Sequence, residues 1–275
     1  MEYIQRAIEK ARSEREGAIS HNEGTDSNNA PDVNMNSSYS TRAPKEPVDV
    51  QYSKTRRVTI SDDELKAKNI FAGFAHDPRS EPYRQLRSQV LKKMREEGLQ
   101  TLAITSPTVG NGKTLTALNL AISLSQEVNQ TVLLVDLDLR NPGVAAALGI
   151  DEVENGIVDS VMNRVALEDI LINPGYNRLV IAPGTPQGHQ TSEILSSPQM
   201  QTMQAELKGR YADRLIIYDL PALLTSDDAL VFAPRADAIL LVLEDGGASE
   251  KELKQAMKLL QGTKILGTII NKHQP

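Results

Sequence analysis

A glycine-rich segment near the middle of the chain has the residue types that bind phosphate. Two glycines permit positive φ, so successive backbone N–H groups can surround a phosphate at the start of a helix. In such a loop Lys113 would reach the β- and γ-phosphates of a nucleotide, and the hydroxyl of Thr114 would bind Mg²⁺. An ordinary glycine turn is the alternative, because Pro107 stands where the usual phosphate-loop pattern has its first glycine. The segment reads Ser106-Pro107-Thr108-Val109-Gly110-Asn111-Gly112-Lys113-Thr114.

Three carboxylates follow apolar runs that are typical of strands. Asp136 and Asp138 follow one run, 132–135, and Asp219 follows another, 215–218. Alternate residues of a strand point the same way, so Asp136 and Asp138 are expected to share a side. A charge directly after an apolar run is costly unless a cation compensates it, although acids also end strands without any function. Beside the lysine and threonine of the loop, the three acids predict a site for Mg²⁺ and a nucleotide.

Short β-rich runs alternate with helical patterns through most of the chain. Several runs consist of Val, Ile and Leu without alternation, which is typical of strands covered on both faces. The alternation predicts an α/β fold with a doubly wound, mostly parallel sheet, which binds ligands at the carboxyl ends of its strands. The expected strands are 102–105, 132–136, 179–182, 215–219, 239–243 and 265–270, and the expected helices are 114–126, 192–208 and 249–261.

The beginning of the chain differs in composition from the rest. Residues 1–17 place apolar side chains at i, i+3, i+4 and i+7, which predicts a short amphipathic helix. This helix is either a frayed end or a docking element. Residues 18–62 are rich in Ser, Asn, Asp and Pro and too poor in apolar residues to offset the entropy of ordering, so we expect a flexible, disordered linker. Residues 63–275 are expected to form the folded domain.

The composition argues against several kinds of function. The chain has 30 Lys and Arg against 36 Asp and Glu, a formal charge of -6, which argues against a general electrostatic hold on nucleic acid. The absence of cysteine excludes thiolate chemistry and Cys-based metal centres, and four scattered histidines argue against a histidine metal cluster. No apolar run approaches the roughly 18 residues of a membrane-spanning helix, so we expect a cytoplasmic protein.

In combination, the loop and the three acids resemble those of the bacterial tyrosine autokinases of exopolysaccharide and capsule loci. These kinases belong to the deviant P-loop ATPases, together with the partitioning and division-site-positioning ATPases. Residues 81–87, Glu-Pro-Tyr-Arg-Gln-Leu-Arg, match the E-x-x-R-x-x-R segment of the kinases, and Thr108 stands where the partitioning branch has a signature lysine. The resemblance covers roughly 80–272. It implies the P-loop NTPase fold and a protein-tyrosine kinase that uses ATP and Mg²⁺.

The resemblance also implies roles for single residues. Asp136 is the first candidate to orient and deprotonate an acceptor tyrosine, while Asp138 and Asp219 would hold Mg²⁺ with Thr114, directly or through water. The sequence does not decide which acid has which role. Asn271 is expected to contact adenine, unless it only ends a strand. Lys113 is expected to be catalytic, and the residues expected to bind ATP are Thr108, Val109, Gly110, Asn111, Gly112, Lys113, Thr114, Leu115, Arg140 and Asn271.

Assembly, acceptors and partners are implied in the same way. Glu81, Arg84 and Arg87 are expected to join subunits into a ring, or they form only a solvated helix face with ion pairs. The kinases usually have acceptor tyrosines in a C-terminal cluster, which is missing from this sequence. The possible acceptors are therefore Tyr3, Tyr39 and Tyr52. A separate inner-membrane polysaccharide co-polymerase, or chain-length determinant protein, is expected to recruit the chain to the inner face of the plasma membrane.

Three functions are compatible with these residues. The first is a Mg-ATP-dependent protein-tyrosine (auto)kinase that regulates exopolysaccharide or capsule polymerisation and export. The second is a nucleotide-switched ATPase of the same machinery with little kinase activity, which the missing tyrosine cluster favours. The third, a partitioning-type ATPase, is opposed by the acidic charge and the missing signature lysine.

Overall fold

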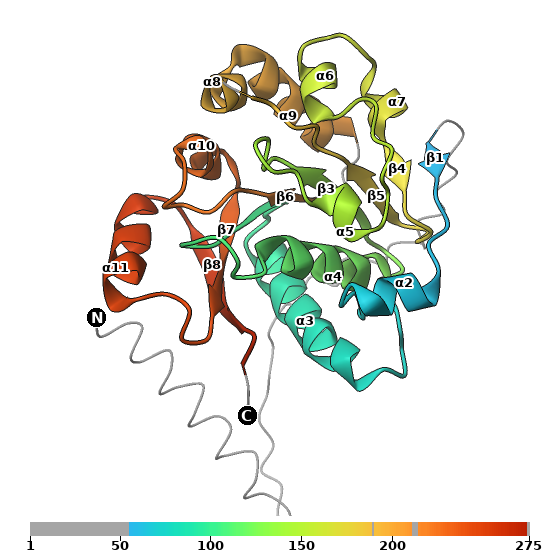
Figure 1. Cartoon of the computed structure of the whole chain (residues 1–275), viewed down its shortest axis with the longest axis horizontal. Helices are drawn as coiled ribbons and strands as arrows, with labels where there is room; N and C mark the ends of the chain where they lie inside the picture. Colours follow the sequence, from blue (N-terminus) through green and yellow to red (C-terminus); the bar gives the residue numbers. More distant parts are fainter. Residues whose placement is uncertain (1–54, 189, 211–213, 274–275) are drawn as a thin grey trace, which may run out of the picture. The chain divides into compact units, whose positions relative to one another are not determined.

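The computed structural model describes residues 55–188, 190–210 and 214–273, all of which belong to one compact unit (Figure 1). Its centre is an eight-stranded sheet with the order β1-β4-β5-β3-β6-β2-β7-β8. All neighbouring strands are parallel except β4 and β5, so the predicted mostly parallel sheet is confirmed. The strands are β1 (Arg56–Arg57), β2 (Thr101–Thr105), β3 (Thr131–Asp136), β4 (Ile172–Asn173), β5 (Leu179–Ala182), β6 (Arg214–Asp219), β7 (Ala238–Glu244) and β8 (Ile265–Asn271).

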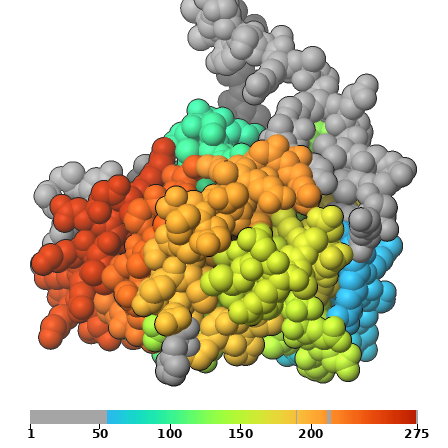
Figure 2. Space-filling view, turned by 90° about the horizontal axis from the view of Figure 1, so that it is seen from above, coloured from blue at the N-terminus to red at the C-terminus, as the bar shows by residue number. Residues whose placement is uncertain are grey.

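Helices cover both faces of the sheet, which makes the fold doubly wound. The first layer consists of α2 (Asp62–Ala67), α3 (Glu81–Glu96), α4 (Lys113–Ser125) and α5 (Val144–Ala147), with the short 3-10 helix η1 (Pro78–Ser80) before α3. The second layer consists of α6 (Ile157–Val161), α7 (Leu167–Ile170), α8 (Thr191–Ser196), α9 (Pro198–Arg210), α10 (Asp228–Phe232), the 3-10 helix η2 (Ala233–Arg235) and α11 (Glu250–Leu259). Figure 2 views this second layer, with gold and orange segments between the yellow-green α6 and α7 and the red α11.

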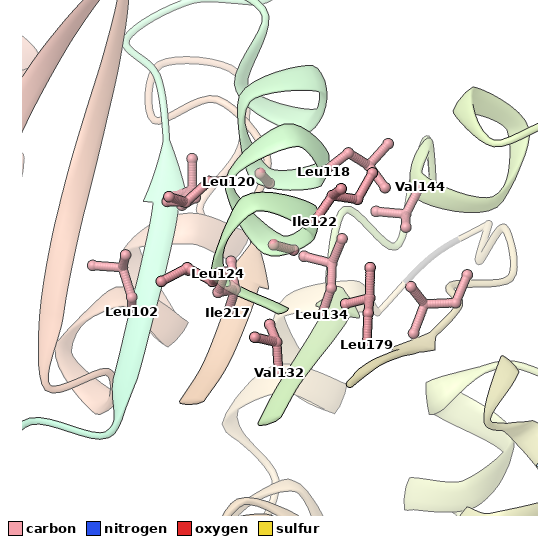
Figure 3. Packing of buried hydrophobic residues seen from close by; sticks show 14 of the residues in the cluster. Leu102, Leu118, Leu120, Ile122, Leu124, Val132, Leu134, Val144, Leu179 and Ile217 are labelled. Carbon is pink, nitrogen blue, oxygen red and sulfur yellow. The ribbon is translucent and has the colours of Figure 1, made fainter. Parts of the chain in front are cut away.

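Two apolar cores, one on each face, explain why the strands are apolar throughout. Successive side chains of a strand point to opposite faces. In β3, Val132 and Leu134 belong to the core under α3 and α4, whereas Leu133 and Val135 belong to the core under the second layer. Figure 3 shows the first core, in which α4 packs on the sheet. Since α4 has sheet on one side and helices on the other, every residue from 116 to 125 is buried.

Two of the expected boundaries differ from the observed ones. The predicted helix 192–208 is two helices, because Ser197 precedes Pro198 and takes an extended conformation (φ -62°, ψ 152°), as residues before proline usually do. Pro198 then starts α9, where its missing N–H costs nothing. The second difference is at the domain boundary: β1 and the Ser61 cap of α2 lie inside the predicted linker 18–62, so folded structure begins before residue 63.

The rest of the expected N-terminal region, including Tyr3, Tyr39 and Tyr52, lies outside the described residues. Among the residues that the structure does describe, no helix has the length and apolar character needed to cross a bilayer.

The sheet brings the predicted site together at one edge. The strands that precede the glycine-rich loop and the three acids are β2, β3 and β6, and β6 lies between the other two. Asp136 of β3 is directly opposite Asp219 of β6, which in turn is opposite Ile104 of β2. The carboxyl ends of these parallel strands therefore meet at the same place.

Candidate functional site

The glycine-rich loop has the backbone conformation that its two glycines permit. Gly110 and Gly112 have φ of 84° and 85°, in the left-handed region, and α4 begins directly after Gly112. The side chain of Asn111 fixes the loop from inside: its Nδ2 donates to the carbonyl of Thr108 (2.8 Å), and its Oδ1 accepts the N–H of Glu244 (2.8 Å). The loop is therefore tied to the end of β7 and stands at a helix N-terminus, as a phosphate site requires.

Lys113 and Thr114, the first residues of α4, reach the acids of the neighbouring strands. The Nζ of Lys113 lies 2.7 Å from Oδ2 of Asp138 and 3.9 Å from Oδ1 of Asp219. The hydroxyl of Thr114 donates to Oδ2 of Asp219 (2.6 Å). Only 13% of the Lys113 side chain is exposed, so this cation and these carboxylates interact with little screening by water. The fold thus brings these four predicted residues together.

Burial and mutual charge shift the pKa values in this cluster. Burial raises the pKa of Asp219, and the Lys113 cation and the Thr114 hydroxyl partly offset that rise. Burial alone would lower the pKa of Lys113, but the charges of Asp219 and Asp138 outweigh it and hold the pKa above its ordinary value. The lysine is therefore charged at neutral pH and compensates the acids around it.

Asp136 is completely enclosed, as Asp219 is. Its side chain is fully buried, its Oδ2 accepts the N–H of Val144 at the start of α5 (2.9 Å), and its Oδ1 accepts the N–H of Asp138 (3.2 Å). Burial, and then the charge of Asp219, raise the pKa of Asp136 to about 8. In this conformation the Asp136 carboxyl shapes the turn after β3, whereas the Asp138 carboxylate, whose side chain is 11% exposed, is bonded to Lys113.

The donor set suits a divalent cation that keeps most of its water. Oδ1 of Asp219 is buried and has no hydrogen-bond partner in the described part of the chain. The other oxygen, Oδ2, accepts the hydrogen bond from the Thr114 hydroxyl. Within residues 55–188, 190–210 and 214–273, no group of three or more Asp, Glu or His side chains is arranged to hold a metal by itself. Mg²⁺ does not need such a cage, because it binds through one or two protein oxygens, phosphate and water.

The other residues predicted to bind ATP occupy varied positions. Thr108 accepts from Asn111 through its carbonyl and hydroxyl, Val109 is 69% exposed at the loop's tip, and Leu115 packs on the first core. Asn271, at the end of β8, donates from Nδ2 to the carbonyl of Asn111 (3.0 Å) and lies against Gly112. It thus touches the phosphate loop itself, and its predicted contact with adenine stays a prediction.

Arg140, the arginine predicted to bind ATP, is held by residues of α8 and α10. The Nε of Arg140 donates to Oδ2 of Asp228 on α10 (3.0 Å) and lies 3.1 Å from the hydroxyl of Thr191 on α8. Sequence reasoning missed both partners. The sequence around Asp228 has one local signal: in residues 227–232, two acids precede four apolar residues. This pattern indicates only the acidic first turn of a helix.

The three residues predicted to assemble subunits lie on α3 but do not form one surface. Glu81 and Arg84 form an exposed ion pair, and Arg84 also donates to the carbonyl of Ala75 (2.8 Å). Arg87 points to α4, where its Nη1 donates to the carbonyl of Ser123 (3.0 Å) and its Nε lies 3.1 Å from Glu127. Arg87 therefore joins α3 to the helix that carries the phosphate-loop lysine.

The fold agrees with comparisons to known proteins. The chain is similar to the tyrosine-protein kinase YwqD of Bacillus subtilis (strain 168), with 29% identity over 70% of this chain and 80% of that protein. It is also similar to the succinoglycan biosynthesis transport protein ExoP of Rhizobium meliloti (strain 1021), with 31% identity over 63% of this chain and 22% of that protein. Among solved structures, the VpsO kinase domain matches with a TM-score of 0.64 and 26% identity over 78% of this chain and 100% of that one.

A family model, described as the CobQ/CobB/MinD/ParA nucleotide binding domain, matches residues 102–275, which is more than half of the chain. The matched range begins in β2 and includes the glycine-rich loop, the lysine and the three acids. The chain therefore belongs to the CobQ/CobB/MinD/ParA family of nucleotide-binding domains.

Proposed function

We propose that this chain is a Mg-ATP-dependent protein-tyrosine kinase that regulates the polymerisation and export of exopolysaccharide or capsule. The observation that carries the proposal is the placement of Lys113 between Asp138 and Asp219, directly after a loop whose two glycines have left-handed φ. A phosphate loop, a buried cation and strand-end carboxylates are the parts that phosphoryl transfer needs. The similarity to YwqD, named a tyrosine-protein kinase, supports tyrosine as the acceptor, and the similarity to ExoP supports a role in polysaccharide export.

The residues of this site have separate tasks in the transfer. The N–H groups of the loop and the Lys113 ammonium would bind the β- and γ-phosphates, while Thr114 and Asp219, with Asp138, would hold Mg²⁺. Mg²⁺ held there would supply positive charge to the phosphate oxygens. The tyrosine oxygen forms a bond to the γ-phosphorus, the bond between that phosphorus and the bridging oxygen breaks, and ADP leaves with the electron pair. The hydroxyl proton passes to a carboxylate.

Two acids are candidates for that proton. Asp136 has the raised pKa that suits a general base near neutral pH, but both of its oxygens accept backbone N–H groups in a fully buried position. Asp138 is also buried, but it is bonded to Lys113, and that bond would be lost when the lysine turns to the phosphates of ATP. The substitutions Asp136→Asn and Asp138→Asn distinguish the two. Loss of transfer with intact Mg-ATP binding identifies the base, whereas loss of Mg-ATP binding identifies a ligand or a structural residue.

Location and assembly complete the proposal. The kinase works in the cytoplasm as a ring or another homo-oligomer, and a separate inner-membrane co-polymerase recruits it to the plasma membrane. The exposed Glu81 and Arg84 on α3 are the surface available for contact with a neighbouring subunit. ATP binding and phosphorylation then set the state of the assembly. We propose no binding of nucleic acid, since the net charge is -6.

A nucleotide-switched ATPase of the same machinery is the second candidate, and one observation favours it. The described tyrosines are Tyr83, Tyr176 and Tyr218, and none of them is exposed. Burial raises the pKa of each of these phenols. An acceptor must therefore belong to another protein or to the residues outside the described part, namely Tyr3, Tyr39, Tyr52 or Tyr211.

The deciding experiment is incubation of the full chain with Mg-ATP, with and without the cytoplasmic tail of a co-polymerase. Intact mass and tryptic mapping are then compared with a Lys113→Met control. Added phosphate on tyrosine in the wild type only establishes the kinase. Release of ADP without added mass on either protein moves the function to the ATPase switch, and no nucleotide turnover under any condition contradicts both.

A further inference from the structure

The last strand of the chain, β8, forms one outer edge of the sheet, and among the described residues no strand pairs with its outer side. The N–H of Asp245 donates to the carbonyl of Asn271 (2.9 Å), so the backbone of Asn271 faces β7. Alternate residues of a strand face opposite neighbours, so the backbone N–H and carbonyl groups of Thr268 and Ile270 face outward. Both side chains are exposed, that of Ile270 by 54%. These backbone groups are therefore accessible to a further strand.

The sequence of this edge has little of the usual protection against pairing. Edge strands of natural proteins are commonly interrupted by charge or proline, or are covered by another element. Residues 265–271 contain neither a charge nor a proline. Lys93 of α3 protects the start of the strand, where its Nζ donates to the carbonyl of Leu266 (2.7 Å). From Thr268 onward, the edge has the features of a surface that pairs with another segment.

A groove between α3 and β8 lies beside this edge. Apolar and glycine residues make up most of its lining, which includes Leu86 and Val90 of α3 and Leu240, Gly267 and Ile269 of the sheet. Successive side chains of an added strand would point to opposite faces of the sheet. Those on the α3 side would enter the groove. The edge therefore suits a segment that has apolar side chains at alternate positions.

Residues 48–52, Val-Asp-Val-Gln-Tyr, have this alternation. We call them the docking segment. They precede β1, which forms the opposite edge of the sheet (Figure 1). The partner strand of β1 is β4, which begins at Ile172 opposite Arg56, and the element before it is the helix α7. The strand β4 therefore provides no partner for residues that precede β1.

The docking segment cannot reach β8 of its own chain. Tyr52 is four residues from Arg56, so it can lie at most about 14 Å from that residue. The two edges of an eight-stranded sheet are roughly 30 Å apart. A second copy of the chain is under no such limit. Contacts between one edge of each copy and the opposite edge of the next are head to tail, and they form a ring if the rotation closes.

We propose that the docking segment of one copy adds as a strand to β8 of a neighbouring copy. This inference deepens the proposed function, because it rests on the homo-oligomer proposed there and adds a contact to it. The alternative for this edge is symmetric pairing of two β8 strands. With full antiparallel overlap, Lys272 would stand opposite Lys264 of the second copy, and like charges in that position are destabilising. The docking segment contains one acid and no base, so it avoids this repulsion.

The first test measures the mass of the full chain by light scattering, without nucleotide. Ile270→Lys places a charge on the outer edge and should shift the mass toward that of a single chain. Val50→Asp, in the docking segment, should have the same effect. Leu259→Lys makes the same kind of change at an exposed position of α11 and should keep the wild-type mass. A wild-type mass in both Ile270→Lys and Val50→Asp would overturn the inference and leave the proposed homo-oligomer standing.

The second test uses the absence of native cysteine to detect the contact directly. Full chains that carry only Asp49→Cys are mixed with full chains that carry only Thr268→Cys and are oxidised mildly, again without nucleotide. Tags of different mass distinguish the heterodimer from the two homodimers. The inference predicts a disulfide-linked heterodimer, which should be lost when Leu259→Cys replaces Thr268→Cys.

The outcomes separate the possible occupants of the edge. A heterodimer that is no more abundant than with Leu259→Cys overturns the inference. A dominant homodimer of Thr268→Cys also overturns it, because the edge then pairs with a second β8. If the wild type has the mass of a single chain and no heterodimer forms, the homo-oligomer and this inference both fail. Neither test contains ATP, so they fail separately from the test of the kinase.

Discussion

The ammonium of Lys113 is 2.7 Å from Oδ2 of Asp138, so the lysine of the phosphate loop is neutralised by an acid that follows β3, two strands away from β2 in the sheet. A nucleotide that enters the loop brings phosphate oxygens that compete for the same cation. In the proposed transfer, the lysine would turn to the phosphates and release the Asp138 carboxylate. ATP binding would then free this acid when Mg²⁺ and an acceptor hydroxyl need one.

Removal of the lysine charge tests this arrangement. Lys113→Met leaves Asp138 and Asp219 without their cation and removes a contact to the transferred phosphate, so phosphoryl transfer should fall by at least about 10²-fold. The measurement is ADP release and incorporation of phosphate under saturating Mg-ATP. Lys92→Met, at an exposed position of α3, is the control and should retain wild-type turnover. Unchanged turnover in Lys113→Met would contradict the assignment of the site.

The sequence predicts the sheet well because its central strands are long apolar runs. All six predicted strands are present within a residue or two of their expected ends. The two strands that were missed, β1 and β4, have two residues each and pair mainly with one another, so they leave no hydrophobic period to detect. The break between α8 and α9 has a local signal in Pro198, which the helical pattern around it hides.

The candidate site is predictable only where chemistry coincides with a strand end. Asp136 and Asp219 end their strands, Asp138 follows β3 closely, and Lys113 and Thr114 follow β2 after the glycine-rich loop, so the parallel order of the sheet brings them together. Arg140 contacts Asp228 on α10 and Thr191 on α8, which are 88 and 51 positions away in the sequence, and no pattern along the chain links them. Likewise, the spacing of Arg84 and Arg87 on one helix cannot show that the first is exposed and the second is bound to α4.

The two loop glycines, Gly110 and Gly112, allow the effect of backbone strain to be separated from the effect of a collision with Asn271. Both have positive φ, and an L-residue in this conformation costs about 1–2 kcal/mol. A Cβ at Gly110 would meet no atom within 4 Å, whereas a Cβ at Gly112 would collide with the amide of Asn271. Gly112→Ala should therefore weaken nucleotide binding more than Gly110→Ala does. Titration with a fluorescent ATP analogue measures the affinity of both variants. Equal losses of affinity would show that the Asn271 side chain moves aside without affecting nucleotide binding.

The strand that leads into the loop is held by an acid whose charge depends on pH. Asp237, before β7, accepts the N–H groups of Gln100 and Thr101 through Oδ2 (both 2.9 Å) and the ammonium of Lys208 through Oδ1 (2.7 Å). Partial burial by itself would raise the pKa of Asp237, but these hydrogen bonds, the one from Lys208 first, outweigh it and hold the pKa below its ordinary value. The folded state thus stabilises the charged form of this carboxylate.

The sign of the resulting pH effect follows from linkage. A lowered pKa in the folded state contributes stability above the pKa of the unfolded chain, about 3.9, and this contribution is lost as the pH falls through the folded pKa. Asp237→Asn should therefore lower the free energy of unfolding by about 1–3 kcal/mol at pH 7 and by less at pH 3. Urea unfolding of both proteins at the two pH values measures the difference. The same difference at pH 3 and pH 7 would mean that the charge of Asp237 has no part in holding β2.

The arginines of α3 should have different effects when they are replaced. The Glu81→Ala/Arg84→Ala variant removes a mostly solvated ion pair and the hydrogen bond from Arg84 to the Ala75 carbonyl, so it should lower the melting temperature less than Arg87→Ala does. If α3 contacts a second subunit, it should also lower the mass measured by light scattering. Arg87→Ala removes a side chain that is only 18% exposed and leaves the Ser123 carbonyl and Glu127 without their partner. It should lower the melting temperature by several degrees, because one or two kcal/mol corresponds to such a shift in a domain of this size. Lys92→Ala on the same helix is the control for both.

A wild-type mass in the Glu81→Ala/Arg84→Ala variant would leave Glu81 and Arg84 as a solvated pair. A wild-type melting temperature in Arg87→Ala would show that Arg87 does not stabilise the contact between α3 and α4.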